Sequence, residues 1–330
     1  MSGRLLRPRR RPCGKRGGTS EQEGFSAPGR LILPSLFRRF GGMHRLVFLF
    51  CALWAFGLQG QERRDSLAEI GRLILDSPEY AIRDSANRLF TQKLKDYLRS
   101  EQGYADDLDN CSHMMALQAK DQRFRIFTWQ MPDAQFHYRR YGLVAVRTRR
   151  GVVITELNDQ LENLAELRFR TFGPEEWPGA IYYKLLPEGQ NGNRYTLLGL
   201  AMGSEINRKM VEVIEVRNTG KVRFGAKMFR IQDFLDQTYR QPPMRLVLPY
   251  NAKYSVTVNW HPEEDKVIMD HLAPPDPKMK GLYQTYGPDF SYDALVWEDG
   301  WWHLEENVRF NSGQERAIRP PTKPLDLPRR

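Results

Sequence analysis

Residues 295–304 read LVWEDGWWHL, two apolar-rich runs, 295–298 and 301–304, with Asp299 and Gly300 between them. Asp-Gly between two such runs favours a two-residue turn, because both residues tolerate the positive φ angles that a tight hairpin requires. The stretch therefore predicts two neighbouring antiparallel strands joined by a tight turn.

Upstream, Tyr254, Val256, Val258 and Trp260 alternate with polar residues, which predicts a strand over 253–260 with one buried face. The other predicted strands are 124–129, 138–146, 152–155, 180–186, 195–200, 209–216 and 266–271. Because short connections join antiparallel neighbours, we expect a mainly β fold built as an antiparallel meander. A curled sheet, a sandwich and a propeller-like arrangement all remain open, since no repeat of about 40 residues selects the propeller.

Two helices and one short helical crossover are predicted around these strands. Ser66 and Glu69 have the spacing of a capping box, and Ser77 with Pro78 favours a second helix start. The apolar faces expected for the two helices are Leu67, Ile70, Leu73 and Ile74, then Ile82, Ala86, Leu89, Phe90, Lys93 and Tyr97. We therefore expect a helical segment, 61–118, packed on an antiparallel β domain, 119–310, with a short helix within 158–167.

The N-terminal region carries a pattern typical of export. A short basic start at Met43 precedes the apolar run 46–58, which predicts a signal peptide over 43–60. The run would extend roughly 20 Å as a helix, short of the ~30 Å hydrocarbon core, so a membrane span or a buried helix is the weaker alternative. Residues 1–42 are basic and predicted disordered: either translation starts at Met43 or they form a true extension. A Pro-rich disordered tail is expected over 311–330.

The net charge of +10 belongs almost entirely to this leader. The first 60 residues hold 11 Lys and Arg against two Glu, a net of +9, which leaves the other 270 residues at +1. A folded domain that binds nucleic acid would concentrate basic residues on its own surface, so we expect no nucleic-acid partner. Removing the leader leaves Cys111 as the one cysteine, and stability then depends on packing rather than on an internal disulfide.

Candidate ligand-binding residues gather in the segment 270–293 and the hairpin that follows it. Its four prolines restrict the backbone, so polar side chains can be held with little entropy loss on binding. The predicted site residues are Asp270, His271, Asp276, Tyr286, Asp289, Asp293 and Trp301. Oxygen and imidazole groups of this kind also ligate cations, although their spacing matches no fixed metal motif. The alternative is that Asp and Pro shape turns while the tyrosines close the end of the sheet.

Three other groups of residues carry side chains that are common in catalytic or binding sites. Glu305 and Glu306 resemble a glycosidase carboxylate pair, yet neighbours on a strand face opposite ways, so only one can enter a cleft. The tryptophans 297, 301 and 302 suit a sugar-stacking platform or, alternatively, core packing. Cys111 and His113 are too close in sequence for the usual thiol–base pair, which meets through the fold.

HLAPPDP at 271–277 and GLYQTYGPDFSYDAL at 281–295, with residues 125–129, 179–185 and 195–199, resemble a family of uncharacterised exported bacterial proteins. The resemblance covers most of 65–310. It implies export and a shared fold, and it brings no activity. Residues 1–42 and the tail depart from the pattern.

We therefore expect an exported protein that is periplasmic, outer-membrane-associated or extracellular, with no transmembrane span in the mature chain. The leading hypothesis is a non-enzymatic binding protein that takes a glycan or another envelope component at 270–293. The rival is a secreted hydrolase that uses Asp and His from the same segment, and a purely structural envelope protein is the third alternative. No cofactor is expected, except that the hydrolase would be able to use a divalent cation.

Overall fold

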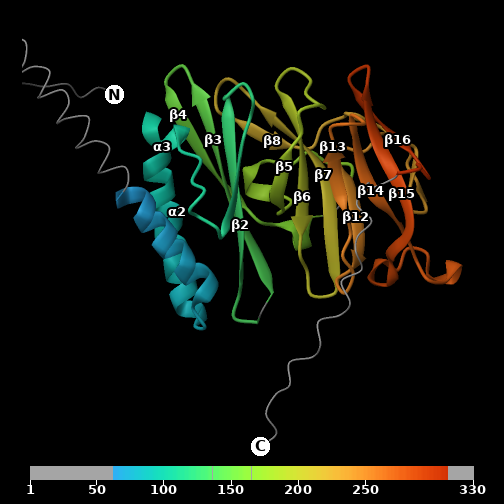
Figure 1. Cartoon of the computed structure of the whole chain (residues 1–330), viewed down its shortest axis with the longest axis horizontal. Coiled ribbons are helices and arrows are strands. Elements are labelled where there is room, and N and C mark those ends of the chain that lie inside the picture. The colour runs from blue at the N-terminus through green and yellow to red at the C-terminus, as the bar shows by residue number, and fades with distance from the viewer. Residues whose placement is uncertain (1–61, 136, 165, 311–330) are drawn as a thin grey trace, which may run out of the picture. The chain divides into compact units, whose positions relative to one another are not determined.

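A computed structural model of the chain describes residues 62–135, 137–164 and 166–310. These residues confirm a mainly β fold with antiparallel sheets and an N-terminal helical pair (Figure 1). The predicted leader over 1–60 and the predicted tail over 311–330 lie outside the described residues.

The helical pair consists of a helix over residues 62–76 and α2, Tyr80–Leu98, followed by the short α3, Glu101–Ala105. Ser66 is not a helix start, because the helix already runs through 62–65. Ser77 and Pro78 lie in the connection, and Glu79 is the N-cap of α2. Among the described residues, no helix is both long enough and apolar enough to cross a membrane.

Sixteen strands follow, fourteen of them in three sheets. The first sheet has the order β1-β2-β3-β4, with bounds Met114–Gln118, Phe124–Pro132, Tyr138–Thr148 and Gly151–Asn158. The second sheet has the order β12-β7-β6-β5 with β8 on β7; the bounds are Leu246–Asn251, Ile206–Val216, Arg194–Ala201, Ile181–Leu185 and Val222–Phe224. The third sheet has the order β13-β14-β15-β16-β9; the bounds are Val258–His261, Lys266–Ala273, Gly287–Glu298, Trp301–Glu305 and Phe229–Arg230. β10, Asp233–Phe234, and β11, Gln237–Thr238, form a separate two-stranded hairpin.

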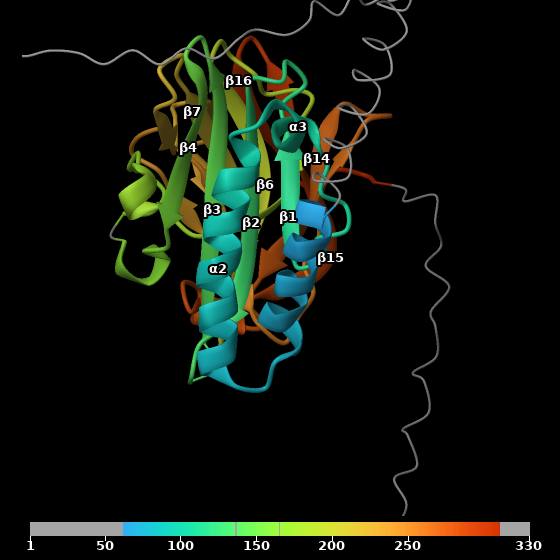
Figure 2. The same ribbon diagram turned by 90° about the vertical axis from the view of Figure 1, so that its left-hand side faces the viewer.

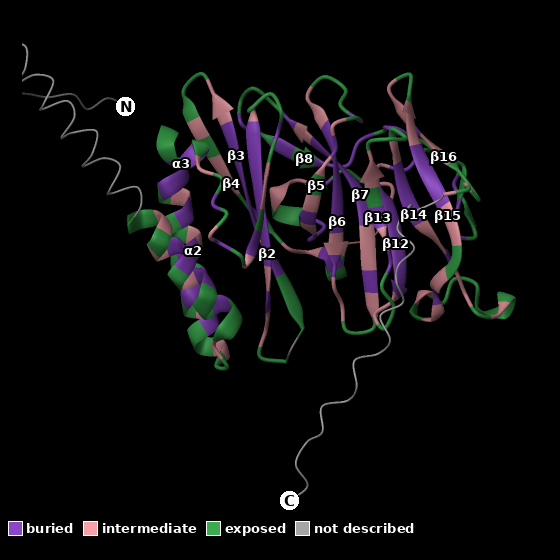
Figure 3. Cartoon of the chain, viewed as in Figure 1, coloured by how far each residue is buried: buried purple, intermediate pink, exposed green. Residues whose placement is uncertain are grey.

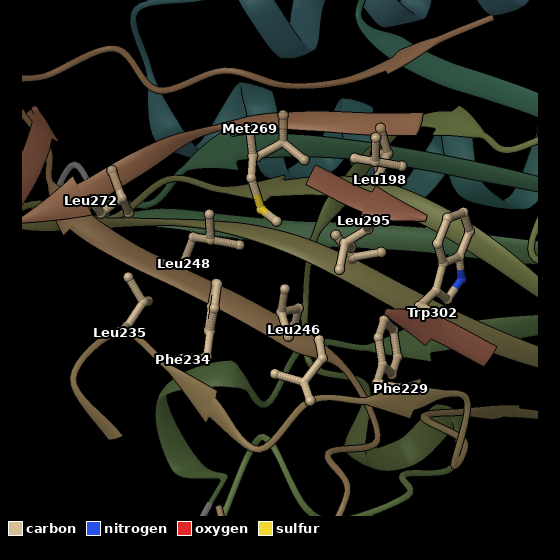
Figure 4. Packing of buried hydrophobic residues seen from close by; sticks show 14 of the residues in the cluster. Leu198, Phe229, Phe234, Leu235, Leu246, Leu248, Met269, Leu272, Leu295 and Trp302 are labelled. Carbon is tan, nitrogen blue, oxygen red and sulfur yellow. The ribbon is translucent and has the colours of Figure 1, made fainter. Parts of the chain in front are cut away.

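The helices and the three sheets form four successive layers, which realise the sandwich alternative (Figures 1 and 2). One apolar core joins the helices to the first sheet, a second joins the first and second sheets, and a third joins the second and third sheets. Buried residues therefore run along the strand centres, while the turns are exposed (Figure 3). Figure 4 shows the third core, where Leu246 and Leu248 of the second sheet pack near Met269 and Leu295 of the third.

Side-chain hydrogen bonds cross each layer boundary, and one buried example from each boundary illustrates them. Trp129 Nε1 donates to Asn87 Oδ1 of α2 at 2.7 Å. The Tyr182 backbone N–H donates to Thr128 Oγ1 at 3.0 Å, and Trp302 Nε1 donates to Thr196 Oγ1 at 3.0 Å. Apolar burial is non-directional, whereas a buried donor needs its acceptor, so these contacts fix how each layer is placed on the next.

The predicted Asp-Gly hairpin between residues 298 and 301 is present. Asp299 and Gly300 both have positive φ, 49° and 80°, and β15 and β16 pair across them. The described strands of the three sheets pair antiparallel, except for the short parallel pairing of β9 with β16.

Besides the helix starts, three predicted boundaries or elements differ from the structure. The strand predicted over 253–260 begins only at Val258, because Tyr254 lies in a turn where its N–H donates to the Asn251 carbonyl. The predicted short helix within 158–167 is a single 3-10 turn, η1, Leu161–Asn163. The first strand begins at Met114, before the predicted domain boundary at 119.

Candidate functional site

The candidate site is centred on a bulge in the third sheet. In the β14–β15 pairing, Asp270 lies opposite Tyr292 and Leu272 lies opposite Pro288, so His271 alone faces the three residues 289–291. Phe290, in the middle of the bulge, has φ of +72°, a left-handed conformation that bulky residues rarely adopt. Bulges of this kind re-aim side chains and are over-represented beside functional sites.

His271 is held by a buried carboxylate on the neighbouring strand. Its Nδ1 lies 2.8 Å from Asp293 Oδ2, and the Asp293 side chain is only 5% exposed. The second oxygen, Oδ1, accepts a hydrogen bond from the Asn307 N–H at 3.1 Å. Both Asp293 oxygens are therefore occupied, and the imidazole is fixed in orientation while 30% of its side chain stays exposed.

The surroundings of His271 favour its protonated form. The hydrogen bond to Asp293 raises the pKa of His271 above its ordinary value, partial burial opposes that change, and the charges of Asp293, Asp289 and Glu306 add to it. For Asp289, burial alone would raise the pKa. Hydrogen bonds from the Ser291 hydroxyl and N–H, with the nearby His271 charge, nevertheless keep the pKa of Asp289 below its usual range. His271 therefore lies in an acidic environment that stabilises positive charge.

His271 forms part of the wall of a pocket of about 520 Å³, which we call the His271 pocket. The β10–β11 hairpin forms one side, the end of β14 with the loop that follows it forms another, and Glu306 completes the rim. Its apolar lining is Phe234, Leu235, Leu272, Ala273, Pro274 and Pro277. The volume falls within the range typical of small-ligand sites, and the mix of apolar walls with a few polar groups is also typical.

Asp236 connects this pocket to the predicted loop. The Tyr286 hydroxyl donates to Asp236 Oδ2 at 2.9 Å, and Lys280 Nζ lies 2.8 Å from Asp236 Oδ1. The hydrogen bond from Lys280 is the largest cause that lowers the pKa of Asp236. Tyr286 itself is fully buried and also accepts from the Gly281 N–H at 2.8 Å. These contacts fix the loop against the hairpin and keep the pocket wall in place.

Of the predicted residues, His271, Asp293, Tyr286 and Asp289 belong to this arrangement: His271 lines the pocket, Asp293 orients it, and the other two lie around it. The remaining three do not join it. Asp270 Oδ2 accepts from the Thr257 N–H at 2.7 Å, and Asp276 Oδ1 caps the 3-10 helix η3, Pro277–Met279, by accepting from the Lys278 N–H at 2.8 Å.

Trp301 lies at the far end of β15 from the pocket, since it pairs with Glu298, and the Arg230 guanidinium lies 4.9 Å from its ring centre. Trp302 is fully buried in the third core, so the tryptophans of this hairpin serve packing at least in part. Of the acidic pair, Glu306 lines the pocket while Glu305 Oε2 accepts from Lys266 Nζ at 2.6 Å. Because β16 ends at Glu305, Glu306 lies beyond the strand, and the expected alternation of neighbouring strand residues does not apply to this pair.

Asp233, Asp236 and Lys280 are pocket residues that the sequence did not single out. Asp233 and Asp236 belong to a hairpin of two-residue strands, too short for a periodic pattern, and nothing in the chain order pairs it with 271–280. Lys280 lies within the segment 270–293, directly before Gly281, but only the structure shows that its partner is Asp236.

The Cys111–His113 pair offers no nucleophile. Burial raises the pKa of the Cys111 thiol to about 11, and burial lowers the pKa of His113 to about 4. A thiol with so high a pKa stays protonated near neutral pH. In the part of the chain that the structure describes, no three His, Cys, Asp or Glu side chains are grouped to hold a metal ion.

Searches of protein-family models, of curated proteins and of solved structures find no match to this chain. The resemblance to exported bacterial proteins therefore remains a prediction from the sequence, and the functional proposal depends on the geometry of the site.

Proposed function

We propose that the protein is an exported binding protein that takes a glycan in the His271 pocket. The observation that carries the proposal is the His271–Asp293 pair, a partly exposed imidazole fixed by a buried carboxylate at the wall of a pocket of about 520 Å³. The rigid imidazole and the carboxylates Asp233 and Glu306 provide polar groups for sugar hydroxyls. Pro274 and Pro277, which are partly or fully exposed, provide apolar surface for the C–H face of a sugar ring.

Preorganisation is the physical reason why this pocket suits binding. Tyr286 and Lys280 hold Asp236, and Asp293 holds His271, so little side-chain entropy is lost when a ligand enters. Export, which the leader sequence predicts, would place the pocket where glycans of the cell envelope are found.

The test is a calorimetric titration of the purified chain against a panel of mono- and disaccharides. His271→Gln keeps a polar side chain but loses the Asp293 geometry, and we expect it to weaken sugar binding about tenfold or more. Asp276→Asn is the matched control, because Asp276 does not itself line the pocket and asparagine also serves as an N-cap, so η3 and the lining residue Pro277 keep their place. The proposal fails if no sugar binds, or if both variants weaken binding equally.

A hydrolase is the second candidate, and the raised pKa of His271 is the observation that favours it. A histidine that is oriented by a buried carboxylate and favours its protonated form suits a general acid, which would donate a proton to the leaving group of the bond that is cleaved. Incubating the same sugars and their nitrophenyl glycosides with the chain distinguishes the two candidates. Turnover that is lost in both His271→Gln and Asp293→Asn would establish the hydrolase, and binding without turnover would establish the binding protein. Metal analysis of the purified chain tests the divalent cation separately.

A further inference from the structure

A second cavity, larger than the His271 pocket, lies away from it. It has a volume of about 1040 Å³ and is formed by the ends of β3 and β4, the turn that contains η1, and the connection from β6 to β7. We call it the Arg140 cavity, because Arg140 carries its most deeply buried charge. It lies between the first and second sheets, and the functional proposal does not use it.

Arg140 is a buried guanidinium with one side left available. Its side chain is 4% exposed; Nε donates to Asp159 Oδ2 at 2.8 Å and Nη1 donates to the Met202 carbonyl at 3.0 Å. Nη2 makes no hydrogen bond to the described residues and lies 3.8 Å from Glu162 Oε1, beyond hydrogen-bond distance. A guanidinium fixed on two sides presents its remaining N–H donors in a set direction, which suits recognition of a carboxylate.

Glu162 is a loosely held counterion for this guanidinium. Its side chain is 61% exposed, on the 3-10 turn η1, and the same Oε1 atom lies 3.3 Å from Arg208 Nη1. One exposed carboxylate oxygen therefore lies near two arginines without a bidentate pairing. An exposed pair of this kind contributes little free energy, so a ligand carboxylate can replace Glu162.

The same cavity also has acidic groups that have no cation partner. Glu175 and Glu205 line it, both are exposed, and neither forms an ion pair with another described residue. A ligand that fills the cavity therefore meets the Arg140 and Arg208 guanidinium groups together with the carboxylates of Glu175 and Glu205, so a ligand with charges of both signs matches the lining.

We propose that the Arg140 cavity binds a short peptide through its two charged ends. The terminal carboxylate takes the position of Glu162 and accepts hydrogen bonds from Arg140 Nη2 and Arg208 Nη1. The terminal ammonium group faces Glu175 and Glu205. The cavity volume accommodates a peptide of a few residues, since drug-sized ligands occupy cavities of comparable size.

The test uses calorimetry on the purified full chain with dialanine and two blocked forms of it. Dialanine binds; the C-terminal amide, which lacks the carboxylate, binds about tenfold or more weakly, as does the N-acetyl form, which lacks the ammonium group. Absence of binding by dialanine, or equal binding of all three, overturns the proposal. An effect of the amide alone overturns the ammonium half of it.

A gain-of-affinity variant makes the test specific. Glu162→Gln removes the competing counterion from an exposed position, so dialanine binds about two- to fivefold more tightly than to the unmodified chain. Glu176→Gln is the matched control, because Glu176 is similarly exposed, pairs with Arg170 and does not line the cavity. Unchanged or weaker binding by Glu162→Gln contradicts the proposal. His271→Gln leaves dialanine binding unchanged, which keeps this test independent of the glycan site.

Discussion

The helix-covered side of the first sheet and the β14–β15 bulge of the third sheet each contain a partly buried histidine, and the pKa values of the two are shifted in opposite directions. His113 packs edge-on against Phe90 with 4.4 Å between ring centres, and its Nε2 is buried without a hydrogen-bond partner among the described residues. His271 has Asp293 at 2.8 Å. Burial alone lowers the pKa of His113 to about 4, whereas the carboxylate raises the pKa of His271. The partner, more than the burial, decides which histidine holds a proton.

The two histidines also differ in role: His113 packs against the helical layer, whereas His271 is accessible to a ligand. A Cβ atom on Gly71 would lie 2.2 Å from the His113 ring, so the glycine allows the helix over 62–76 to approach His113 closely. His113 is thus one of the contacts by which the helical layer is attached to the sheet. His271 instead borders open space, and the same imidazole group is available there to a ligand.

The largest loss of stability is expected at a fully buried ion pair, and it should exceed the loss expected at either histidine. Arg245 and Glu212 are both 0% exposed and paired at 2.7 Å, and burial raises the pKa of Glu212 although Arg245 opposes this. Arg245→Met leaves that carboxylate without its partner, and we expect a loss of about 3–5 kcal/mol in the free energy of unfolding. Urea denaturation measures it. A double variant that adds Glu212→Gln should lose less, and a single-variant loss below about 1 kcal/mol would show that the partner matters less than we infer.

The next effect tests the histidine that has no partner. Because the unfolded chain binds a proton at His113 near pH 6.5 and the folded chain only near pH 4, stability is lost as the pH falls between these values. His113→Leu removes this proton linkage, so acidification to about pH 4.5 should cost the variant about 2 kcal/mol less than the wild type. Urea denaturation at neutral and acidic pH measures the difference. His137→Leu, at an exposed histidine, is the control and should retain the acid loss.

The smallest effect tests the partnered histidine and has the opposite sign. Because the folded pKa of His271 is raised, its contribution is complete below the unfolded pKa and is lost as the pH rises through the folded value. His271→Gln should therefore be destabilised more at acidic than at alkaline pH, by about 1 kcal/mol, the gain of a charge-assisted hydrogen bond over a neutral one. Thermal unfolding across that range measures it. If the variant lost more stability at alkaline pH, the comparison between the two histidines would fail.

The sequence predicted the fold where residues follow a simple period, and it failed where buried polar residues interrupt one. On α2 the predicted face included Ile82 and Leu89, yet these are 44% and 49% exposed. Arg83 and Asn87 are buried instead. The Arg83 guanidinium donates to the carbonyls of residues 77, 78 and 132, and Asn87 accepts from the indole of Trp129. A periodicity argument cannot foresee such partners, because they come from other elements of the fold.

The site shows the same limit. The dense segment 270–293 pointed to His271 and Asp293, and the structure brings these two together at 2.8 Å. The segment 270–293 gave no indication of Asp233 and Asp236, because the hairpin that carries these two residues contacts the segment only in the tertiary fold. The cluster of polar and proline residues in 270–293 therefore predicted one wall of the pocket. The other wall, the β10–β11 hairpin, is brought there by the tertiary fold and could not be predicted from the sequence.

The parallel pairing of β9 with β16 constrains the order in which the molecule can be completed. Residues 229–230 hydrogen-bond with 302–303, which are synthesised more than seventy positions later, and the rim residue Glu306 follows directly. A chain shortened before 301 would leave the β9 backbone unpaired and an indole-sized gap where Trp302 fills the third core. The third sheet is thus complete only when the last hairpin has been added. A truncated product would expose strands with unpaired backbone groups, which favour aggregation and proteolysis.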